Sequence, residues 1–373
     1  MYICKIFLGT TINENNMYNN KFVKVLTVFL LFVTVSVNAK SEAVEKGEKK
    51  DIKTEIKEYI DHHLLDSHYF NLFSYDTDDG KHKYIGAPLP VILWDNGLQV
   101  FSSSKFNHGK TVAEVNGNYY KLYHNKIYKT DANGTINYDE EHHATNEKPL
   151  DFSITKNVVF IIIVGIIMFF MFKRMATNYK KSPIPTGMAR LLEPIVLYIR
   201  DDIARPNIGE KHYRRFMGYL LTIFFFVWIV NLFGLTPLGV NVTNNIAVTF
   251  ALALLTYLIT TFSGNKNYWK HIFWMPGVPV PMKILLAPIE LLGTLIKPFS
   301  LMIRLYANIT AGHIVLMSLI GLMFIFKNWI GSPLSFGLAF ALALLELLVA
   351  ALQAYIFTML SALYFGSAVE EHH

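Results

Sequence analysis

The stretch VVFIIIVGIIMFFMFKR, residues 158–174, decides the fold class of this chain. Apart from Gly165, residues 158–172 are all apolar, and two basic residues follow them directly. A run of this kind approaches the roughly 20 residues needed to cross a bilayer, and basic residues typically flank the cytoplasmic end of such a span. The whole chain agrees, because 52% of its 373 residues are hydrophobic and only 17% are charged. The sequence therefore predicts a membrane protein.

Four more apolar runs follow in the second half of the chain. Two have ordinary length and two are long, and they cover residues 217–235, 246–262, 289–326 and 334–365. The long runs exceed the thickness of the hydrocarbon core, so these helices must tilt, bend or lie partly along the membrane. We expect an all-α polytopic membrane protein with about five to six membrane helices, two of them long and tilted. Four prolines in residues 270–288 exclude one uninterrupted helix there, and leave a hairpin or a surface segment open for residues 265–290.

The N-terminus has the features of a secretory signal. Lys21 and Lys24 precede VLTVFLLFVTVSV, which is too short to span comfortably, and Ala39 stands where a signal peptidase would cut. We therefore predict a signal peptide over residues 1–39. An uncleaved N-terminal anchor is the alternative.

Residues 40–155 are polar and charged, and predict a small mixed domain outside the membrane. Short strand-like runs flank a turn at Asp95–Gly97. Two histidine-rich stretches raise the question of a metal site, but their spacing matches no zinc pattern, so we expect no metal and no cofactor. The histidines concerned are His62, His63, His68, His82, His142 and His143.

The distribution of basic residues predicts the orientation. Residues 173–215 contain ten Lys or Arg, whereas residues 236–245 contain none. The positive-inside rule therefore places residues 173–215 in the cytoplasm, the N-terminal domain in the periplasm and the C-terminus in the cytoplasm. The signal peptide predicts the same orientation independently. This arrangement also explains the net charge of +6 better than nucleic-acid binding does.

Polar side chains recur along the first long helix. Ser300, Arg304 and Asn308 follow one another at intervals of four residues and form one stripe, and Glu290 lies within about 40° of it and about 21 Å along the axis. His313 comes nine residues after Arg304, about half a turn around, and should face something else. Ionisable groups inside a span are costly, which makes them functional candidates.

The last helix carries a second polar stripe. Glu346, Gln353 and Tyr364 share one face within about 20°. Two such stripes facing each other would form a hydrogen-bonded path of the kind that proton relays use. Arg304 would act there as a fixed charge, because its guanidinium scarcely loses its proton. The carboxylate that it holds ionised need not belong to this chain.

These residues resemble a known family. KPFSLMIRLYANITAGHIV, residues 297–315, and LELLVAALQAYIFTMLSALYFGSAVEEHH, residues 345–373, are similar to the a subunit of rotary F-type ATP synthases. FFFVWIVNLFGLTP and TNNIAVTFALALLTY resemble its earlier helices more weakly. The pairing of R-L-x-x-N-x-x-x-G with L-Q-A-[YF]-I-F some 40 residues later is specific when both occur in membrane spans.

The resemblance implies a non-catalytic, proton-translocating subunit of the bacterial inner membrane. It would form two half-channels that load and unload the carboxylate of a c-subunit ring, and so couple proton flow to ATP synthesis. Its implied partners are the c-ring, the peripheral-stalk b subunits, other ATP synthase subunits and the lipid bilayer. The implied roles are contact with the ring carboxylate for Arg304, the periplasmic half-channel for Asn308, His313, Glu346 and Gln353, the cytoplasmic exit for Glu290 and Ser300, and a further polar site for Tyr364.

One departure from the family pattern concerns a pair of these residues. Many bacterial relatives have a carboxylate at the position of His313 and a histidine at that of Glu346, so the two members are exchanged here. This exchange suggests that the two share a proton, and leaves open which of them takes it first.

Two other classes of protein are alternatives to this one. An ion-coupled secondary transporter would show internal repeats or paired broken helices, and the sequence has neither. A structural scaffold would place Arg304 and Glu346 at its lipid edge, which disagrees with their central positions. A GxxxxGK[ST] phosphate-binding loop is absent from the sequence, so we expect no nucleotide site on this chain.

Overall fold

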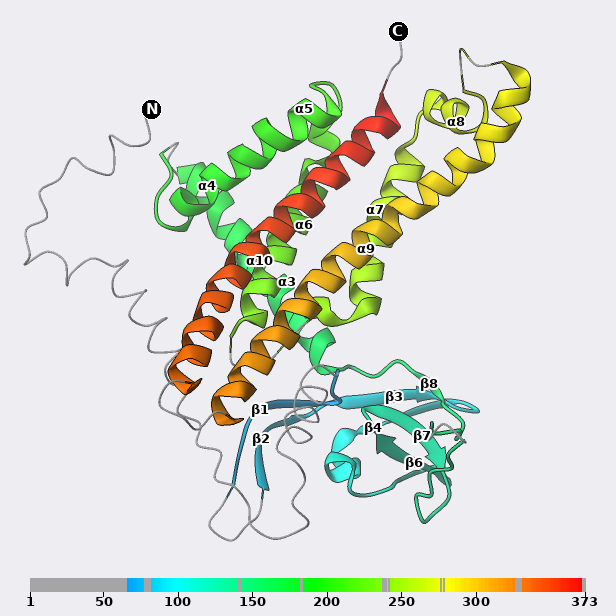
Figure 1. Ribbon diagram of the computed structural model, residues 1–373, viewed down its shortest axis with the longest axis vertical. Helices are drawn as coiled ribbons and strands as arrows, with labels where there is room; N and C mark the ends of the chain where they lie inside the picture. The colour runs from blue at the N-terminus through cyan, green and yellow to red at the C-terminus, as the bar shows by residue number, and fades with distance from the viewer. Residues whose placement is uncertain are drawn as a thin grey trace, which may run out of the picture. The chain divides into compact units, whose positions relative to one another are not determined.

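The computed structural model describes residues 66–76, 82–139, 143–181, 184–236, 240, 242–275, 277, 279–325 and 331–370 (Figure 1). The predicted signal peptide and the histidines at positions 62, 63 and 142 lie outside these residues. Two parts of the chain are distinguished by their structure. A β-rich part precedes Lys156, and a helical part follows it.

The described residues of the β-rich part form three small antiparallel sheets. Their strand orders are β1-β2, β4-β3-β8 and β5-β6-β7. The predicted turn is confirmed, because β3 and β4 form a hairpin around it in which Asn96 and Gly97 adopt positive φ angles of 49° and 134°. The strands are β1 (Tyr69–Asp76), β2 (His82–Pro88), β3 (Pro90–Trp94), β4 (Leu98–Ser102), β5 (Ala113–Val115), β6 (Asn118–Tyr123), β7 (Lys126–Thr130) and β8 (Leu150–Asp151).

A small aromatic core holds this part together. The alternation of side chains along β3 and β4 sends Val91, Leu93 and Phe101 inward, where they meet Tyr120 and Phe106. The Phe101 and Tyr120 rings stack with their centroids 6.2 Å apart. The same alternation turns Trp94, Leu98 and Val100 outward.

Five helices of the described residues are long and apolar enough to cross a membrane. Together with the strands, they confirm the predicted polytopic helical membrane protein with a small mixed domain at its N-terminal side. They are α3 (Lys156–Lys181), α6 (Tyr213–Gly234), α7 (Ile246–Ser263), α9 (Val280–Ile325) and α10 (Gly331–Val369).

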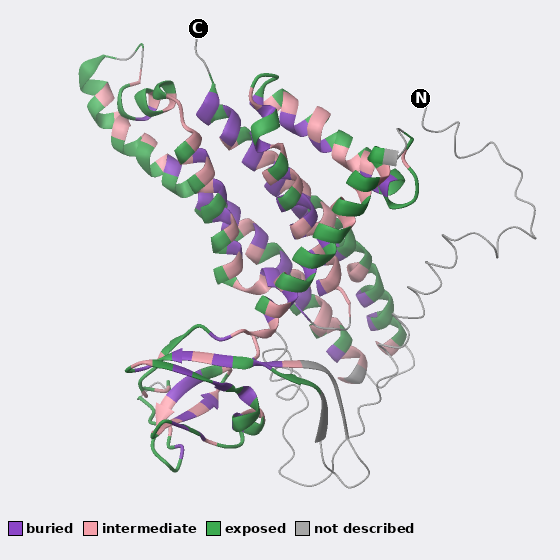
Figure 2. Cartoon of the chain, turned by 180° about the vertical axis from the view of Figure 1, so that it is seen from behind, coloured by how far each residue is buried: buried purple, intermediate pink, exposed green. Residues whose placement is uncertain are grey.

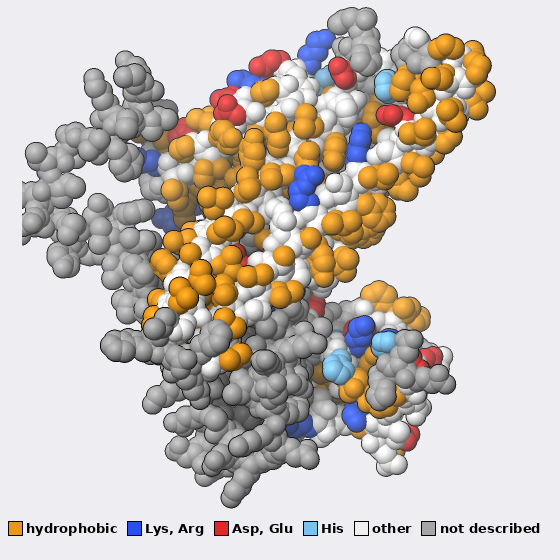
Figure 3. Space-filling view, in the orientation of Figure 1, with side chains coloured by type: hydrophobic (Ala, Val, Ile, Leu, Met, Phe, Trp, Pro, Cys, Tyr) orange, Lys and Arg blue, Asp and Glu red, His pale blue; other side chains and the backbone are white. Residues whose placement is uncertain are grey.

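The two long helices lie side by side (Figure 1). α10 also packs against α6, and α9 also packs against α7. Buried residues line these contacts, as Figure 2 shows along the inner faces of the helices. The Phe216 and Phe365 rings, for example, stack with centroids 4.6 Å apart. The apolar outer surfaces of α9 and α10 are broad and are interrupted by only a few basic side chains (Figure 3).

The segment between α3 and α6 is helical, which the sequence interpretation did not foresee. It contains α4 (Met188–Tyr198), the π-helical turn η4 (Ile199–Ala204) and α5 (Arg205–Ile208). Ile199 and Ile203 are almost fully buried in the helical core. The apolar side of this segment therefore belongs to the bundle.

The end of α10 is fixed at two points. A Cβ atom added to Gly366 would collide with the backbone carbonyl of Asn207 in α5, and would lie 2.9 Å from its carbon atom. Asn265 donates hydrogen bonds from its backbone N to the carbonyl of Ala368, at 2.9 Å, and from its side chain to the carbonyl of Val369, at 3.0 Å. These bonds satisfy carbonyl groups that a helix end leaves without partners.

The start of α9 differs from the prediction. The helix begins at Val280, before Pro288, and contains Pro288 and Pro298. Pro281 lies in its first turn, where a missing N–H costs nothing. Residues 265–290 nevertheless contain a break, because the short helix α8 (Lys266–Phe273) ends before α9 begins. One uninterrupted helix is thus excluded, as expected.

Candidate functional site

The first polar stripe of α9 lies at the surface of the chain. Ser300 and Asn308 are exposed, and Arg304 between them is half-buried. Among the residues that the structure describes, none forms a hydrogen bond or an ion pair with the Arg304 guanidinium. The surrounding surface of α9 is apolar, with Ile303 54% exposed. This helix therefore presents an unneutralised cation outward, within a span.

The opposite side of α9 contains the buried histidine. His313 is 6% exposed, and the preceding residue, Gly312, is in contact with the Glu346 side chain of α10. A Cβ atom at position 312 would lie 3.3 Å from the Glu346 carboxyl carbon and closer still to Oε1. The absence of a side chain at Gly312 thus provides the space that the Glu346 carboxyl group occupies.

Glu346 is buried in an apolar setting. It is 7% exposed, and its Oε2 atom has no hydrogen-bond partner among the described residues. A buried polar atom without a partner is rare in proteins and often marks a functional site. Gln353 lies two turns further along the same face and is 3% exposed. The α10 stripe therefore faces the interior of the bundle.

The two polar stripes do not pair along their whole length. Glu346 meets α9 at Gly312, which follows Asn308 at an interval of four residues and so continues the row of the first stripe, whereas Ser300 and Asn308 are exposed. Tyr364, the last residue of the α10 stripe, also lies close to Arg304. The expectation that the two stripes face each other stays a prediction for the rest of their length.

Tyr364 lies near the basic residues of α9. The Nζ atom of Lys297 is 5.5 Å from the centroid of its ring, a cation–π distance. Tyr364 is also close enough to Arg304 for the two to interact electrostatically. The last polar residue of the α10 stripe is thus brought to the Arg304 side of the contact between α9 and α10.

Glu290 has a different neighbour from the other candidates. Its carboxylate lies 3.9 Å from Nδ1 of His271 in α8. Fourteen helical residues separate it from Arg304, which corresponds to about 21 Å along the axis. The structure therefore brings Gly312 and Glu346 together, and Lys297, Arg304 and Tyr364 together, and leaves Glu290 beside α8.

The sequence interpretation missed hydroxyl groups near Lys297 and Tyr364. Thr256 and Thr260 of α7 are almost fully buried, and Thr256 shares a hydrogen bond of 2.7 Å with the hydroxyl of Tyr219. A cavity with room of about 10 Å³, close to the size of one water molecule, adjoins them. Its polar lining consists of Thr256, Tyr257, Thr260, Tyr268, Thr294, Lys297 and Tyr364.

The threonine spacing was the available signal for these hydroxyl groups. Positions 249, 256 and 260 share one face of an apolar helix. The signal is weak, because threonines in a membrane helix can bond to their own backbone. The Thr260 hydroxyl indeed donates to the carbonyl of Thr256 at 2.7 Å.

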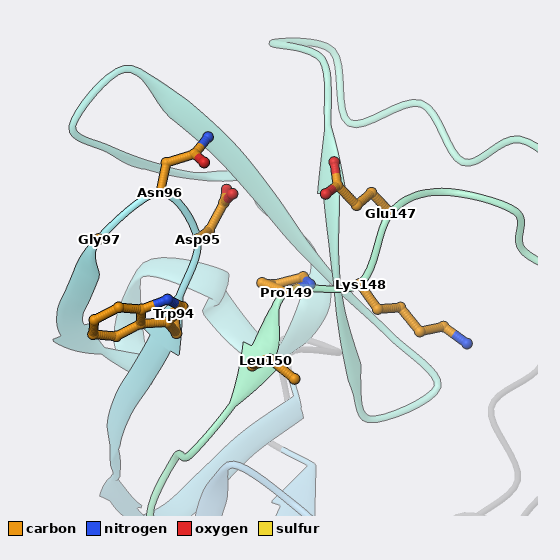
Figure 4. A pocket seen from close by; sticks show the side chains of 8 residues that line it. All are labelled: Trp94, Asp95, Asn96, Gly97, Glu147, Lys148, Pro149 and Leu150. Carbon is orange, nitrogen blue, oxygen red and sulfur yellow. The ribbon is translucent and has the colours of Figure 1, made fainter.

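The β-rich part contains an open pocket of about 620 Å³ (Figure 4). Figure 4 shows the Asp95 and Glu147 side chains among those that line it, with the Lys148 side chain extending away. Asp95 accepts a hydrogen bond of 2.9 Å from the Tyr120 hydroxyl and forms an ion pair with Lys129, whose Nζ atom lies 2.8 Å from Oδ2. The bond from Lys129 lowers the pKa of Asp95, while burial and the bond to Asp95 raise the pKa of Tyr120 to about 12. The Asp95 carboxylate is thus already neutralised by structural partners.

The described histidines at positions 68 and 143 each lie beside an aspartate. His68 contacts Asp151 at 3.0 Å, and His143 lies 3.7 Å from Asp139. Among the described residues, no group of three or more histidine, cysteine or acidic side chains could hold a metal ion.

The fold defines a polytopic membrane protein whose long helices α9 and α10 bury an imidazole and an acidic group. The family model for the ATP synthase A chain matches residues 158–366, which is more than half of the chain. The chain therefore belongs to the ATP synthase A chain family. Residues 59–152 match a second family model, a domain of unknown function (DUF8433).

Curated relatives agree with this assignment. The chain is 45% identical to ATP synthase subunit a of Chloroherpeton thalassium over 232 residues, which cover 60% of this chain and 69% of the relative. It is 44% identical to ATP synthase subunit a 2 of Chlorobaculum tepidum over 227 residues, or 58% and 64% of the two chains. It is 41% identical to ATP synthase subunit a of an Anaeromyxobacter species over 232 residues, or 60% and 56%. The protein is accordingly a membrane subunit of an ATP synthase.

Proposed function

We propose that this subunit conducts protons through two half-channels that load and unload a carboxylate on a rotating c-ring. Arg304 carries the proposal, because it places a permanent positive charge on the outer face of a membrane helix. A cation in a span is costly unless it has a partner, and the described part of the chain supplies no acidic one. The carboxylate of a ring subunit is a partner of the right charge. Beside Arg304, that carboxylate would be driven to release its proton.

The buried side of α9 would serve the periplasmic half-channel. Glu346 and His313 are groups that can exchange protons near neutral pH, and Gln353 extends the polar path along α10. Asn308 would lie where this path reaches the ring. The free Oε2 atom of Glu346 supports the proposal, because a carboxyl group without fixed partners can accept water or a proton.

The exit to the cytoplasm would begin on the other side of Arg304. Ser300 lies one turn before it, and Glu290 lies further toward α8. Tyr364 would hold the position between the two half-channels, beside Lys297 and Arg304. A fixed cation between the two paths prevents protons from running directly from one to the other.

The proposed orientation places residues 40–155 in the periplasm and the C-terminus in the cytoplasm of a bacterium. It includes a signal peptide over residues 1–39 and location in the inner membrane. The ten basic residues within 173–215 support it. A cysteine introduced at the exposed Asn133 should react with an impermeant reagent from outside the cell, and labelling from the cytoplasm would contradict this orientation.

The subunit would catalyse no reaction itself. Its sequence lacks a phosphate-binding loop, which supports nucleotide chemistry on other subunits. Its other partners would be the b subunits of the peripheral stalk.

Proton pumping in inverted membrane vesicles tests the proposal. Arg304→Ala should abolish ATP-driven acidification while the assembled complex remains in the membrane. Arg190→Ala removes an exposed arginine from α4, outside the spans, and should leave acidification unchanged. Normal acidification with Arg304→Ala would overturn the proposal.

A further inference from the structure

One face of the β4-β3-β8 sheet consists of exposed apolar side chains. The strand register places Leu98, Trp94 and Leu150 in one row across the three strands. Figure 4 shows Trp94 on β3 and Leu150 on the neighbouring strand β8. Val100 and Phe152 extend the same face. We call these five residues the apolar sheet face.

The apolar sheet face is too large to be incidental. Its side chains are between 56% exposed, at Trp94, and 64% exposed, at Phe152. Together they present apolar surface on the order of 500 Å², which is at the upper end of what a soluble surface usually leaves uncovered. None of the five residues is charged. A partner of this face must therefore be apolar.

The chain places this face beside the membrane. Phe152 precedes Lys156, the first residue of α3, by four positions, so their Cα atoms are at most about 14 Å apart. Hydrogen bonds keep the intervening chain on the sheet, because Phe152 N donates to the carbonyl of Ile92 at 2.9 Å and Ile154 N to that of Pro90 at 3.1 Å. The membrane helix thus begins two residues after the last of these bonds.

The start of α3 is also tied to the β-rich part. The backbone N of Lys156 donates to the carbonyl of Ser67 at 2.9 Å, and that of Asn157 donates to the Asp66 carboxylate at 3.2 Å. The link between sheet and span is therefore short and hydrogen-bonded at both ends. It holds the sheet within reach of the interfacial layer at the end of the span.

We propose that the apolar sheet face docks on the lipid bilayer, with Trp94 and Phe152 in the interface between headgroups and acyl chains. Tryptophan is enriched at this depth, because its ring is apolar while its N–H keeps a polar partner. Leucine, valine and phenylalanine supply the apolar contact that burial in an interface requires. The β-rich part thereby lies on the membrane that its own α3 spans. This inference depends on the membrane location of α3 and not on proton conduction.

Quenching by lipid-attached nitroxides tests the contact in the full chain reconstituted into liposomes. Cys4, the one cysteine of the sequence, is replaced by serine, and a fluorophore is attached to Val100→Cys on the apolar sheet face. Glu114→Cys on β5 is the matched control, because it is an exposed position on another sheet. Leu98→Cys is the second probe if the Val100 variant does not fold.

Nitroxides near the headgroups should quench the Val100 probe at least about threefold more strongly than the Glu114 probe. The Val100 probe should also be protected from aqueous iodide. Equal and weak quenching at both positions would overturn the proposal. Protection from iodide without quenching by lipid would overturn it as well, since another protein segment or subunit would then cover the face.

Discussion

The contact between Gly312 and Glu346 gives the sharpest prediction about proton movement. Replacing Gly312 with alanine adds one methyl group at a position 3.3 Å from the Glu346 carboxyl carbon and 3.4 Å from its Cγ atom, with Oε1 closer still. The Glu346 side chain must then leave its present position, since the atoms that the methyl group meets belong to a flexible side chain, which gives way more easily than the α9 backbone. Gly312→Ala therefore displaces a candidate proton-carrying group without removing it.

The size of the effect follows from the cost of overpacking. An extra methyl group in a filled interior costs about 1 to 3 kcal/mol, which reduces the population of the present Glu346 position by a factor of about 5 to 150. We expect ATP-driven acidification of inverted vesicles to fall by about tenfold, with membrane-bound ATPase activity as the measure of assembled complex. Glu346→Asp shortens the side chain and should partly restore acidification in the Gly312→Ala background.

Gly293→Ala is the control for this experiment. Gly293 lies in the same helix, and an added Cβ atom there would meet no atom of the chain within 4 Å. The Gly293→Ala variant should acidify inverted vesicles at the normal rate. Normal pumping by Gly312→Ala at normal assembly would refute the role given to this contact.

Two further predictions concern stability. Gly366→Ala should prevent α10 from packing on Asn207 and lower the melting temperature of the purified chain by several degrees. Gly337→Ala is the control, because an added Cβ atom there meets no atom within 4 Å. Equal melting temperatures of the two variants would contradict the close approach of Gly366 to Asn207. Asp95→Asn should weaken the bond to Lys129 and destabilise the β-rich part by about 2 kcal/mol, measured by protease susceptibility. Because the folded-state pKa of Asp95 is lowered, this difference should be complete above about pH 4 and vanish as the pH falls further, and a difference independent of pH would count against the ion pair.

The apolar runs of the sequence were sufficient to predict the membrane helices. Each run expected within residues 158–365 lies inside one of the five long helices, apart from the last residues of two runs, Leu235 and Phe326, of which Phe326 lies outside the described residues. A long apolar run is a strong signal for a membrane helix, because a helix forms all of its backbone hydrogen bonds within itself, as lipid requires. The start of α9 was less predictable, since a proline in the first turn is compatible with a helix and Pro288 did not end it.

The helices α4 and α5 show where this signal fails. Their segment is rich in basic residues, so its composition indicated a cytoplasmic connection. Its buried apolar positions, such as Leu192, Ile199 and Ile203, alternate with exposed and charged residues and continue through a turn with π-helical geometry. Only the packing of these residues against α10 and α6 reveals that the segment belongs to the core.

Helical geometry predicted part of the candidate site. The half turn between Arg304 and His313 correctly placed the two on different sides of α9. Which stripe would be buried could not be derived, since that depends on the rotation of α10 about its axis. The contact of Glu346 with Gly312 was likewise hidden, because a glycine in an apolar helix gives no sign of what occupies its empty side.

Disulfide cross-linking between this chain and the ring subunit tests the central claim most directly. That claim is that the Arg304 stripe faces a carboxylate on another subunit, while the Glu346 stripe lies inside the bundle. Asn308→Cys, on the exposed stripe, should form a disulfide with a cysteine placed beside the ring carboxylate. Ala354→Cys, which is fully buried in α10, should form none. A disulfide from Ala354→Cys and none from Asn308→Cys would contradict the account.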